Sequence, residues 1–285
     1  MATGYSSTIA TMKTSKMTTN APKKAVILAA GSGSRLRPLT DLCPKPLIKV
    51  NGTPILHNAL RNLEAVGVED VTIVVGYRKD AIQYACGNRF GGFKINYVES
   101  TVFDRTGSAY SLWLARNALL SGDCYLLEGD VFFEADALRY LNVANALDVA
   151  AVAPFESSME GSAVTLSEHG LISEFRMKQT AAKLDADGPA LFKTMNILRL
   201  NSTTLRQTIV PSLNDIIGSG GTQTYTEELL AGLIERGRLQ LAAVRCDDLR
   251  WYEIDSADDL RIAESIFATA SPRSSDGSFE HPIVG

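Results

Sequence analysis

The chain has 285 residues, of which 45% are hydrophobic and 21% charged, and its formal net charge is −4. This composition suits a globular domain with a full apolar core, and an acidic chain without a basic run is a poor match for nucleic acid. No apolar stretch approaches the roughly 20 residues of a membrane span, and the four scattered cysteines lack the spacing of a zinc site or disulfide framework. We therefore expect a cytoplasmic protein with reduced thiols, no nucleic-acid partner and no membrane span.

The two ends of the chain differ from its middle. Residues 1–22 are rich in threonine and serine, carry lysines but no acid, and lack the apolar segment of a secretory signal. They resemble a transit peptide only faintly, because they contain no arginine. Residues 271–285 also have the composition of a disordered tail. We expect disordered tails at 1–22 and 271–285 around one folded domain at 23–270.

The first half of this domain alternates strands and helices. Residues 25–30 form a continuous apolar run, as in a strand that is buried on both faces. Thr53 and Pro54 then favour a helix start, with Thr53 as N-cap and apolar residues at helical spacing up to Val66. Further strands are expected at 71–75, 95–98 and 124–127, and helices at 80–86 and 107–120. This order predicts an α/β fold with a doubly wound, mostly parallel, Rossmann-like sheet.

The second half has a different pattern. Short strands are expected at 149–152, 163–166, 171–175 and 192–198, helices at 205–217 and 226–236, and strands at 239–244 and 251–254. Ser256 is placed to cap a last helix, whose first turn carries Asp258 and Asp259 where the helix dipole favours acids. By analogy with two-part α/β enzymes, we expect this mixed α+β half to bind an acceptor substrate.

A glycine-rich loop follows the first expected strand. Residues 28–40 read LAAGSGSRLRPLT, and PKPL follows at 44–47. Glycines let backbone N–H groups approach phosphate oxygens, and Arg35 and Lys45 supply the positive charge that a triphosphate and its leaving pyrophosphate need. A Rossmann fingerprint would need glycine at Leu36, and the GK[ST] of a Walker A loop is missing. A plain turn with a solvated arginine is the alternative.

The whole string, GxGxRLxPLT followed by PKPL, resembles the signature of the nucleotidyltransferase superfamily that makes nucleotide-sugars and CDP-alcohols. The resemblance covers residues 24 to about 131. It implies that the loop wraps a nucleoside triphosphate, that Arg35 contacts phosphates and that Lys45 assists transfer, so both are candidate catalytic residues. The candidate nucleotide-binding residues are Leu28, Ala30, Gly31, Ser32, Gly33, Gly76, Tyr77, Thr106, Gly107, Ser108 and Glu128.

Two groups of these candidate residues are expected near the nucleobase. Thr106, Gly107 and Ser108 open an expected helix, and a helix N-terminus exposes N–H donors. The family places nucleobase contacts near this point. Gly76 and Tyr77 follow the second strand and are expected to flank the base.

Two aspartates are candidate metal ligands. Phosphoryl transfer from a nucleotide usually needs Mg²⁺, which prefers carboxylate oxygens. Asp130 stands at the end of an expected strand, where α/β proteins bind ligands, and Asp255 precedes the capped helix. The resemblance implies that both aspartates hold Mg²⁺. The alternative is that one or both merely cap helices.

The second half narrows the family. Its segments MEGSA (159–163), FKTMNI (192–197), PSL (211–213), YTEE (225–228) and WYEID (251–255) resemble the cytidylyltransferases for phosphocholine and aminoethylphosphonate, and more the phosphonate type. This implies CTP as the nucleotide and a small phosphonate or phosphate as acceptor. Lys193 would contact the acceptor's oxyanion, Glu160 and Glu227 an acceptor amine, and Glu253 would orient its neighbours on the acceptor side. The alternatives are a lysine that faces water and acids on a solvated face.

The expected chemistry is a direct in-line attack of an acceptor oxygen on the α-phosphorus of CTP, which releases pyrophosphate. No covalent intermediate is expected, because no nucleophile with an adjacent base is evident in the sequence. One alternative is a sugar-1-phosphate or inositol-phosphate nucleotidyltransferase. Another is a catalytically silent nucleotide-binding regulatory module on the same fold. Self-association into a homodimer is left open.

Overall fold

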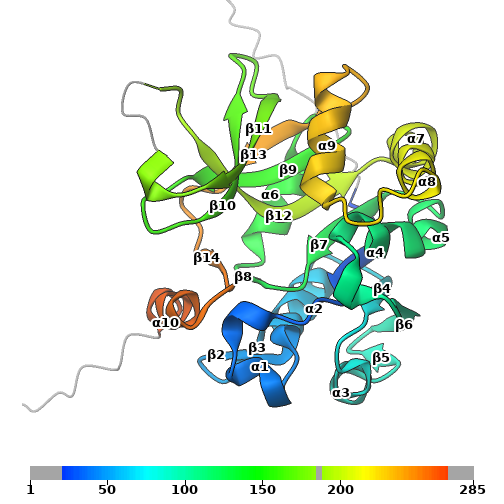
Figure 1. Cartoon of the computed structure of the whole chain (residues 1–285), viewed down its shortest axis with the longest axis vertical. Coiled ribbons are helices and arrows are strands. Elements are labelled where there is room, and N and C mark those ends of the chain that lie inside the picture. The colour runs from blue at the N-terminus through cyan, green and yellow to red at the C-terminus, as the bar shows by residue number, and fades with distance from the viewer. Residues whose placement is uncertain (1–20, 184–187, 269–285) are drawn as a thin grey trace, which may run out of the picture.

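The computed structural model describes residues 21–183 and 188–268. A mixed ten-stranded sheet runs through the molecule, with helices on both faces (Figure 1). Its longest path has the strand order β11-β10-β12-β7-β1-β4-β6-β5, and β9 and β13 join it along β12. The doubly wound α/β architecture expected from the sequence is confirmed.

The N-terminal half supplies the parallel part of the sheet. Its strands are β1 (Lys24–Ala29), β4 (Asp70–Val75), β6 (Phe93–Glu99) and β7 (Cys124–Glu128), with the short antiparallel β5 (Arg89–Phe90) at the edge. β1 lies between β7 and β4 and pairs with both in parallel. Because successive side chains of a strand point to opposite faces, Ile27 packs in one core cluster and Val26 and Leu28 in another.

Helices cover both of these faces. The face of Ile27 is covered by α2 (Ile55–Ala65), α3 (Lys79–Cys86) and α6 (Asp136–Val143). The face of Val26 and Leu28 is covered by α4 (Ser108–Leu114), α5 (Arg116–Leu119), α8 (Val210–Gly218) and α9 (Thr226–Glu235). A strand that is covered on both faces is uniformly apolar, as the run at 25–30 predicted.

The C-terminal half continues the sheet with mainly antiparallel strands. These are β9 (Val149–Pro154), β10 (Gly161–Leu166), β11 (Ile172–Gln179), β12 (Phe192–Leu200) and β13 (Ala242–Arg245). β12 joins the two halves, because its first residues pair with β10 and its last residues with β7. A short α7 (Ser202–Thr204) follows β12 and leads through a π-helical turn into α8.

A separate pair of strands ties the C-terminus to the first half. β14 (Trp251–Glu253) pairs antiparallel with β8 (Val131–Phe133), and Ile254 N–H donates to Asp130 O over 2.9 Å. α10 (Ala257–Ile266) follows and begins at Ser256, whose hydroxyl accepts from Asp259 N–H as the sequence predicted. This pairing places the chain after β7 beside the chain after β14.

The expected elements are present with two local corrections. Thr53 is not a helix N-cap: it lies with Pro54 in β3 (Thr53–Pro54), which pairs with β2 (Lys49–Val50), and α2 begins at Ile55. The reason is the hairpin turn at Asn51 and Gly52, both at positive φ, since Asn-Gly favours this turn. The helix expected at 107–120 is divided into α4 and α5 at Ala115.

The domain limits of 23 and 270 stay a prediction. Most of the expected tails, residues 1–20 and 271–285, lies outside the described residues. Among the helices that the structure describes, none has the length and apolar character that crossing a membrane requires.

Candidate active site

A cavity of about 830 Å³ opens at the carboxyl ends of β1 and β7, where open α/β sheets bind ligands. Its lining also includes the glycine-rich loop, the chain before α4, the start of β10, the ends of β11 and β14, the start of β12 and the start of α9. The predicted site residues that line it are Leu28, Ala30, Gly31, Ser32, Gly33, Arg35, Lys45, Thr106, Gly107, Ser108, Glu128, Asp130, Lys193, Glu227, Glu253 and Asp255. Gly76, Tyr77 and Glu160 do not line it.

Local packing fixes the shape of the glycine-rich loop. Leu36 is fully buried in the core cluster below the loop, and the Thr40 hydroxyl donates to Gly33 O over 2.9 Å. Gly33 has a φ of 62°, and a Cβ there would lie 2.8 Å from Lys45 Cβ. Gly33 is therefore required both by its left-handed backbone and by the close passage of Lys45.

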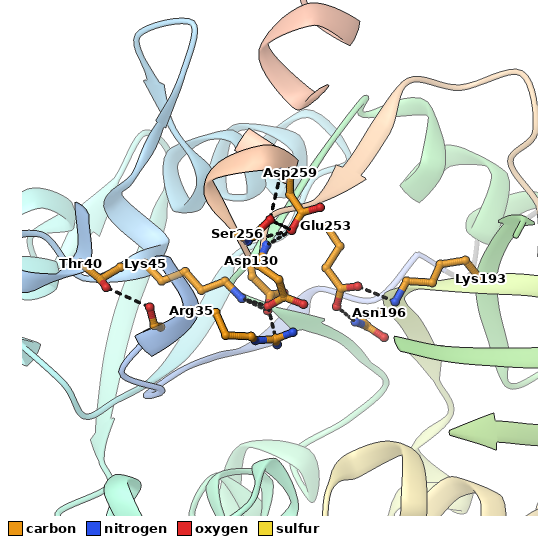
Figure 2. A network of polar contacts seen from close by, with 11 residues as sticks. Arg35, Thr40, Lys45, Asp130, Lys193, Asn196, Glu253, Ser256 and Asp259 are labelled. Carbon is orange, nitrogen blue, oxygen red and sulfur yellow. Dashed lines mark hydrogen bonds and ion pairs between the residues drawn. The ribbon is translucent and has the colours of Figure 1, made fainter. Parts of the chain in front are cut away.

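Lys45 bridges the two candidate metal ligands. Its Nζ lies 2.8 Å from Asp130 Oδ2 and 2.6 Å from Asp255 Oδ1, and Arg35 Nη2 lies 2.8 Å from the same Asp255 oxygen. Figure 2 shows Arg35, Lys45 and Asp130 converging on this point. Burial disfavours the charge on Lys45, but the two aspartates outweigh it and raise the pKa of Lys45. Burial likewise opposes the charge on Asp255, yet Lys45 and Arg35 hold its pKa below the ordinary value.

The backbone at Asp255 is held by the start of α10. Asp255 N–H and Ser256 N–H both donate to Asp259 Oδ2, over 3.1 and 2.7 Å. Ser256 and Asp259 thus form the capping box of the helix. The Asp255 carboxylate is directed instead to Lys45 and Arg35, so the alternative role as a helix cap does not apply to it.

The residues present fit a divalent metal that is bound together with phosphates. Asp130 Oδ1 is enclosed and has no hydrogen-bond partner within the described residues. Mg²⁺ usually takes one or two carboxylates, several waters and substrate phosphate oxygens. Over residues 21–183 and 188–268, no group of three or more metal-binding side chains is arranged to hold an ion unaided. The two aspartates beside the glycine-rich loop match such a partial ligand set.

Lys193 faces the cavity from β12 and is buried, with a relative exposure of 4%. Its Nζ lies 2.5 Å from Glu253 Oε2, and the other carboxylate oxygen of Glu253 accepts from Asn196 Nδ2 over 2.9 Å (Figure 2). Burial raises the pKa of Glu253 to about 7, although Lys193 acts in the opposite direction. The alternative of a strand lysine that faces water is therefore wrong.

Glu128 and Glu227 are two further enclosed acids in the wall of the cavity. Burial raises the pKa of Glu128 well above its ordinary value, and the repulsion of Glu227 adds to the effect. Burial also raises the pKa of Glu227, whose carboxylate accepts a long 3.5 Å hydrogen bond from Ser162. Among the described residues neither acid forms an ion pair. Enclosed carboxylates without a cation are costly, so this wall favours a cationic or hydrogen-bonding ligand group.

Two N–H donors at the N-terminus of α4 are already used by contacts within the protein. Gly107 N–H donates to Thr222 O over 2.8 Å, and Ala109 N–H donates to Thr224 O over 3.1 Å. A Cβ on Gly107 would lie 2.2 Å from Thr224 O, so the glycine permits this close contact. The segment before α9 therefore satisfies two of the donors that were expected to be exposed, whereas Ser108 N–H has no hydrogen-bond partner among the described residues. Thr106, Gly107 and Ser108 still line the cavity.

Gly76 and Tyr77 lie outside the cavity lining and contact the two ends of the glycine-rich loop, at Ala30 and Thr40. Tyr77 N–H donates to Ala30 O over 2.9 Å, and its hydroxyl donates to Thr40 O over 2.8 Å. A Cβ on Gly76 would lie 2.7 Å from Ala30 O. Glu160 lies in a smaller neighbouring cavity of about 290 Å³, which shares Arg35, Lys193, Glu253 and Asp255 with the large one.

Some lining residues carried no usable signal in the sequence. Lys178 adds another cation to the wall, at a positive φ of 55° near the end of β11. Ser162 and Tyr225 also line the cavity. Both belong to segments that resemble the family, but the resemblance implied no role for either residue. The sequence could not place Lys178 at the cavity, because its position depends on how β11 pairs with β10.

Comparison with known proteins identifies the family of the N-terminal part of the chain. Residues 24–161 match the sequence model of the family described as nucleotidyl transferase. This part of the chain is a nucleotidyltransferase domain. The family resemblance drawn from the glycine-rich loop is thereby confirmed.

Relatives of the nucleotidyltransferase domain extend the likeness into the second half. The chain is 35% identical over 248 residues to the CMP-5′-(3-aminopropyl)phosphonate synthase of Streptomyces rubellomurinus, covering 87% of this chain and 39% of that protein. It is 38% identical over 113 residues to the 2-aminoethylphosphonate cytidylyltransferase of Lancefieldella rimae, covering 39% of this chain and 45% of that protein. The chain thus spans less than half the length of either relative.

A solved structure shares the fold of the domain. The CTP:phosphocholine cytidylyltransferase from Streptococcus pneumoniae superposes with a TM-score of 0.70, covering 86% of this chain and 99% of that one. At 23% sequence identity, this likeness establishes the fold alone.

Proposed function

We propose that this protein is a magnesium-dependent cytidylyltransferase, which transfers CMP from CTP to a small phosphonate or phosphate and releases pyrophosphate. The observation that carries the proposal is the meeting of Arg35, Lys45, Asp130 and Asp255 beside the glycine-rich loop. Neutralising the charge of a triphosphate during transfer needs fixed cations and a place for a metal, and this point supplies both.

The proposed reaction is a direct displacement at the α-phosphorus of CTP. A bond forms between an acceptor oxygen and the α-phosphorus, and the bond from that phosphorus to the leaving pyrophosphate breaks. Arg35 and Lys45 stabilise the charge that moves onto the phosphate oxygens. Mg²⁺ bound by Asp130 and Asp255 would add positive charge at the same oxygens.

The acceptor is proposed to lie between Lys193 and the acids of the cavity wall. The buried ammonium of Lys193 suits a phosphonate or phosphate oxyanion, and Glu128 and Glu227 lack a cationic partner among the described residues. An acceptor with an amino group at its far end could place its oxyanion at Lys193 and its amino group at these acids. The 35% identity to a CMP-5′-(3-aminopropyl)phosphonate synthase over most of this chain supports the same class, and we consider 2-aminoethylphosphonate, hydroxyethylphosphonate and phosphocholine as acceptors.

A cytoplasmic location is part of the proposal. All four cysteines are free thiols, as in proteins of a reducing compartment.

The test is pyrophosphate release with Mg²⁺, with four nucleoside triphosphates crossed against a panel of acceptors. The panel contains 2-aminoethylphosphonate, hydroxyethylphosphonate, phosphocholine, inositol phosphate and glucose-1-phosphate. Release only with CTP and a phosphonate or phosphocholine is the expected result. Release with glucose-1-phosphate or inositol phosphate would support nucleotidyl transfer but contradict the proposed class of acceptor. Silence across the panel in a folded sample would favour a regulatory module that binds nucleotide without transfer.

A further inference from the structure

β12 changes its partner beside the cavity. Lys193 pairs with Ala163 of β10, whereas Ile197 pairs with Leu127 of β7. Between these two pairings the register of β12 against β9 is shifted, and Asn196 has a positive φ of 53°. Such an irregularity is a β-bulge, which redirects side chains at the point where it occurs. Asparagine is among the few residue types other than glycine that adopt this backbone readily.

The bulge directs the Asn196 side chain at Glu253. Asn196 Nδ2 donates to Glu253 Oε1 over 2.9 Å, and the Thr194 hydroxyl donates to Asn196 Oδ1 over 3.0 Å. The second bond fixes the orientation of the amide, because the oxygen is occupied by a donor and only the NH₂ group remains for Glu253. Thr194 and Asn196 are both buried, so water competes little for these bonds.

Glu253 in turn confines the ammonium of Lys193. Its second oxygen lies 2.5 Å from Lys193 Nζ. Figure 2 shows the two side chains pointing toward one another. On another side, Gly161 lies close to the same Nζ: a Cβ there would stand 2.6 Å from it, so a larger residue at 161 would displace the ammonium. A lysine side chain has many rotamers in solution, and confinement between Glu253 and Gly161 selects one of them.

We propose that Asn196 is a positioning residue, which acts through Glu253 to hold the Lys193 ammonium where the acceptor's phosphonate or phosphate group binds. This inference rests on the proposed function, because it takes Lys193 as the group that meets the acceptor. Asn196 itself touches neither Lys193 nor the glycine-rich loop by any hydrogen bond between described residues. Removing the Asn196 amide should therefore weaken the use of the acceptor and leave the binding of CTP unchanged. A prealigned ammonium binds an oxyanion without first losing rotamer entropy.

Asn196→Asp is the sharpest variant. Aspartate keeps the size, the left-handed backbone and the bond from Thr194, but it replaces the donor to Glu253 by an acceptor. We expect kcat/KM for the acceptor to fall about 10- to 100-fold, as for the loss of a hydrogen bond to a charged group. The KM for CTP should stay within about twofold. Asn196→Gly keeps the backbone and removes the amide, and it should lower kcat/KM for the acceptor by about tenfold.

Asn51→Asp is the matched control. Asn51 also has a positive φ, of 46°, but it stands in the β2–β3 turn, where its amide donates to Glu264 O. This variant should keep wild-type values for both substrates. An unchanged acceptor KM and kcat in folded Asn196→Asp would overturn the proposal. Equal increases in the KM for CTP and the KM for the acceptor would also overturn it, because they would indicate a general structural role.

A second measurement separates this proposal from the proposed function. If the wild type releases no pyrophosphate with any acceptor, the proposed function fails. Crystal structures of the wild type and Asn196→Asp then decide the positioning role alone. Separation of Lys193 Nζ from Glu253 Oε2 in the variant supports the role, and persistence of the 2.5 Å contact overturns it.

Discussion

At the scale of single residues, Lys45 holds together groups that would otherwise repel. Asp130 and Asp255 come from chain segments far apart in the sequence, and the ammonium between them contacts both carboxylates. Each of these side chains is mostly shielded from water, so the interactions are little screened. Under the proposed function, these three groups are the ones that a bound triphosphate and metal would engage.

Asp130→Asn should lower turnover by about 10²-fold or more, in the range seen when one group is removed from a charge-stabilising site. The amide keeps the shape of the side chain but loses the charge that a metal needs. Steady-state kinetics at saturating Mg²⁺ measure the effect. Asp136→Asn is the control, because Asp136 pairs with Arg139 on the exposed surface and should leave turnover unchanged. Near-normal turnover in Asp130→Asn would remove Asp130 from the metal site.

The two acids predicted for an acceptor amine are separated by the structure. Glu227 lines the large cavity, whereas Glu160 lines the small one. Glu227→Gln should raise the KM for 2-aminoethylphosphonate by about tenfold and leave that for hydroxyethylphosphonate near its wild-type value, because only the first carries an ammonium. Glu160→Gln should change neither. If Glu160→Gln alone raises the KM for 2-aminoethylphosphonate, the amino end of the acceptor lies in the small cavity instead.

At the scale of elements, the glycine-rich loop combines a strained turn with an open approach. Gly33 needs its left-handed backbone and the space beside Lys45, whereas a Cβ on Gly31 would meet nothing within 4 Å. The two glycines therefore serve different purposes. One sets the fold of the loop, and the other leaves its outer surface open to a ligand.

Gly33→Ala should lower the thermal midpoint, and Gly31→Ala should leave it unchanged. Alanine at positive φ costs about 1–2 kcal/mol, and the contact with Lys45 adds to this cost. Thermal unfolding followed by circular dichroism compares the two variants. An equal and small shift for both would mean that the loop relaxes around a Cβ at Gly33.

The sequence predicted those parts of the fold and site that depend on local pattern. Asp130 was singled out because it stands just after an apolar strand, and Asp255 because it precedes a recognisable helix cap, and both line the cavity. The donors at Gly107 were misjudged, because their partners lie more than a hundred residues away in the segment before α9. The bulge at Asn196 was equally out of reach, since it arises where β12 exchanges one neighbouring strand for another.

At the scale of the whole molecule, β12 joins the parallel N-terminal half of the sheet to its mainly antiparallel C-terminal half. The core on both sides of the sheet encloses Cys86, Cys124 and Cys246, whereas Cys43 is only partly buried. Burial raises the pKa of each of the three enclosed thiols to about 12. Their thiolate forms are therefore scarce at neutral pH.

A thiol reagent at pH 8 should modify at most Cys43 rapidly in the native protein and all four cysteines in denaturant. Reactivity follows the thiolate, so the three enclosed thiols should react faster only as the pH rises toward their pKa or as the core opens. A chromogenic disulfide reagent counts the fast-reacting thiols. Two or more in the native protein would contradict the packing of the sheet and helices described above.

The most direct measurement is ³¹P NMR of the products formed from CTP, 2-aminoethylphosphonate and Mg²⁺. The account predicts that pyrophosphate appears together with a product in which the phosphonate phosphorus and the CMP phosphorus are spin-coupled through a shared oxygen. Free CMP without such a product would show hydrolysis instead of transfer. Unchanged spectra with 2-aminoethylphosphonate and with the other phosphonate and phosphate acceptors would contradict the proposed cytidylyl transfer.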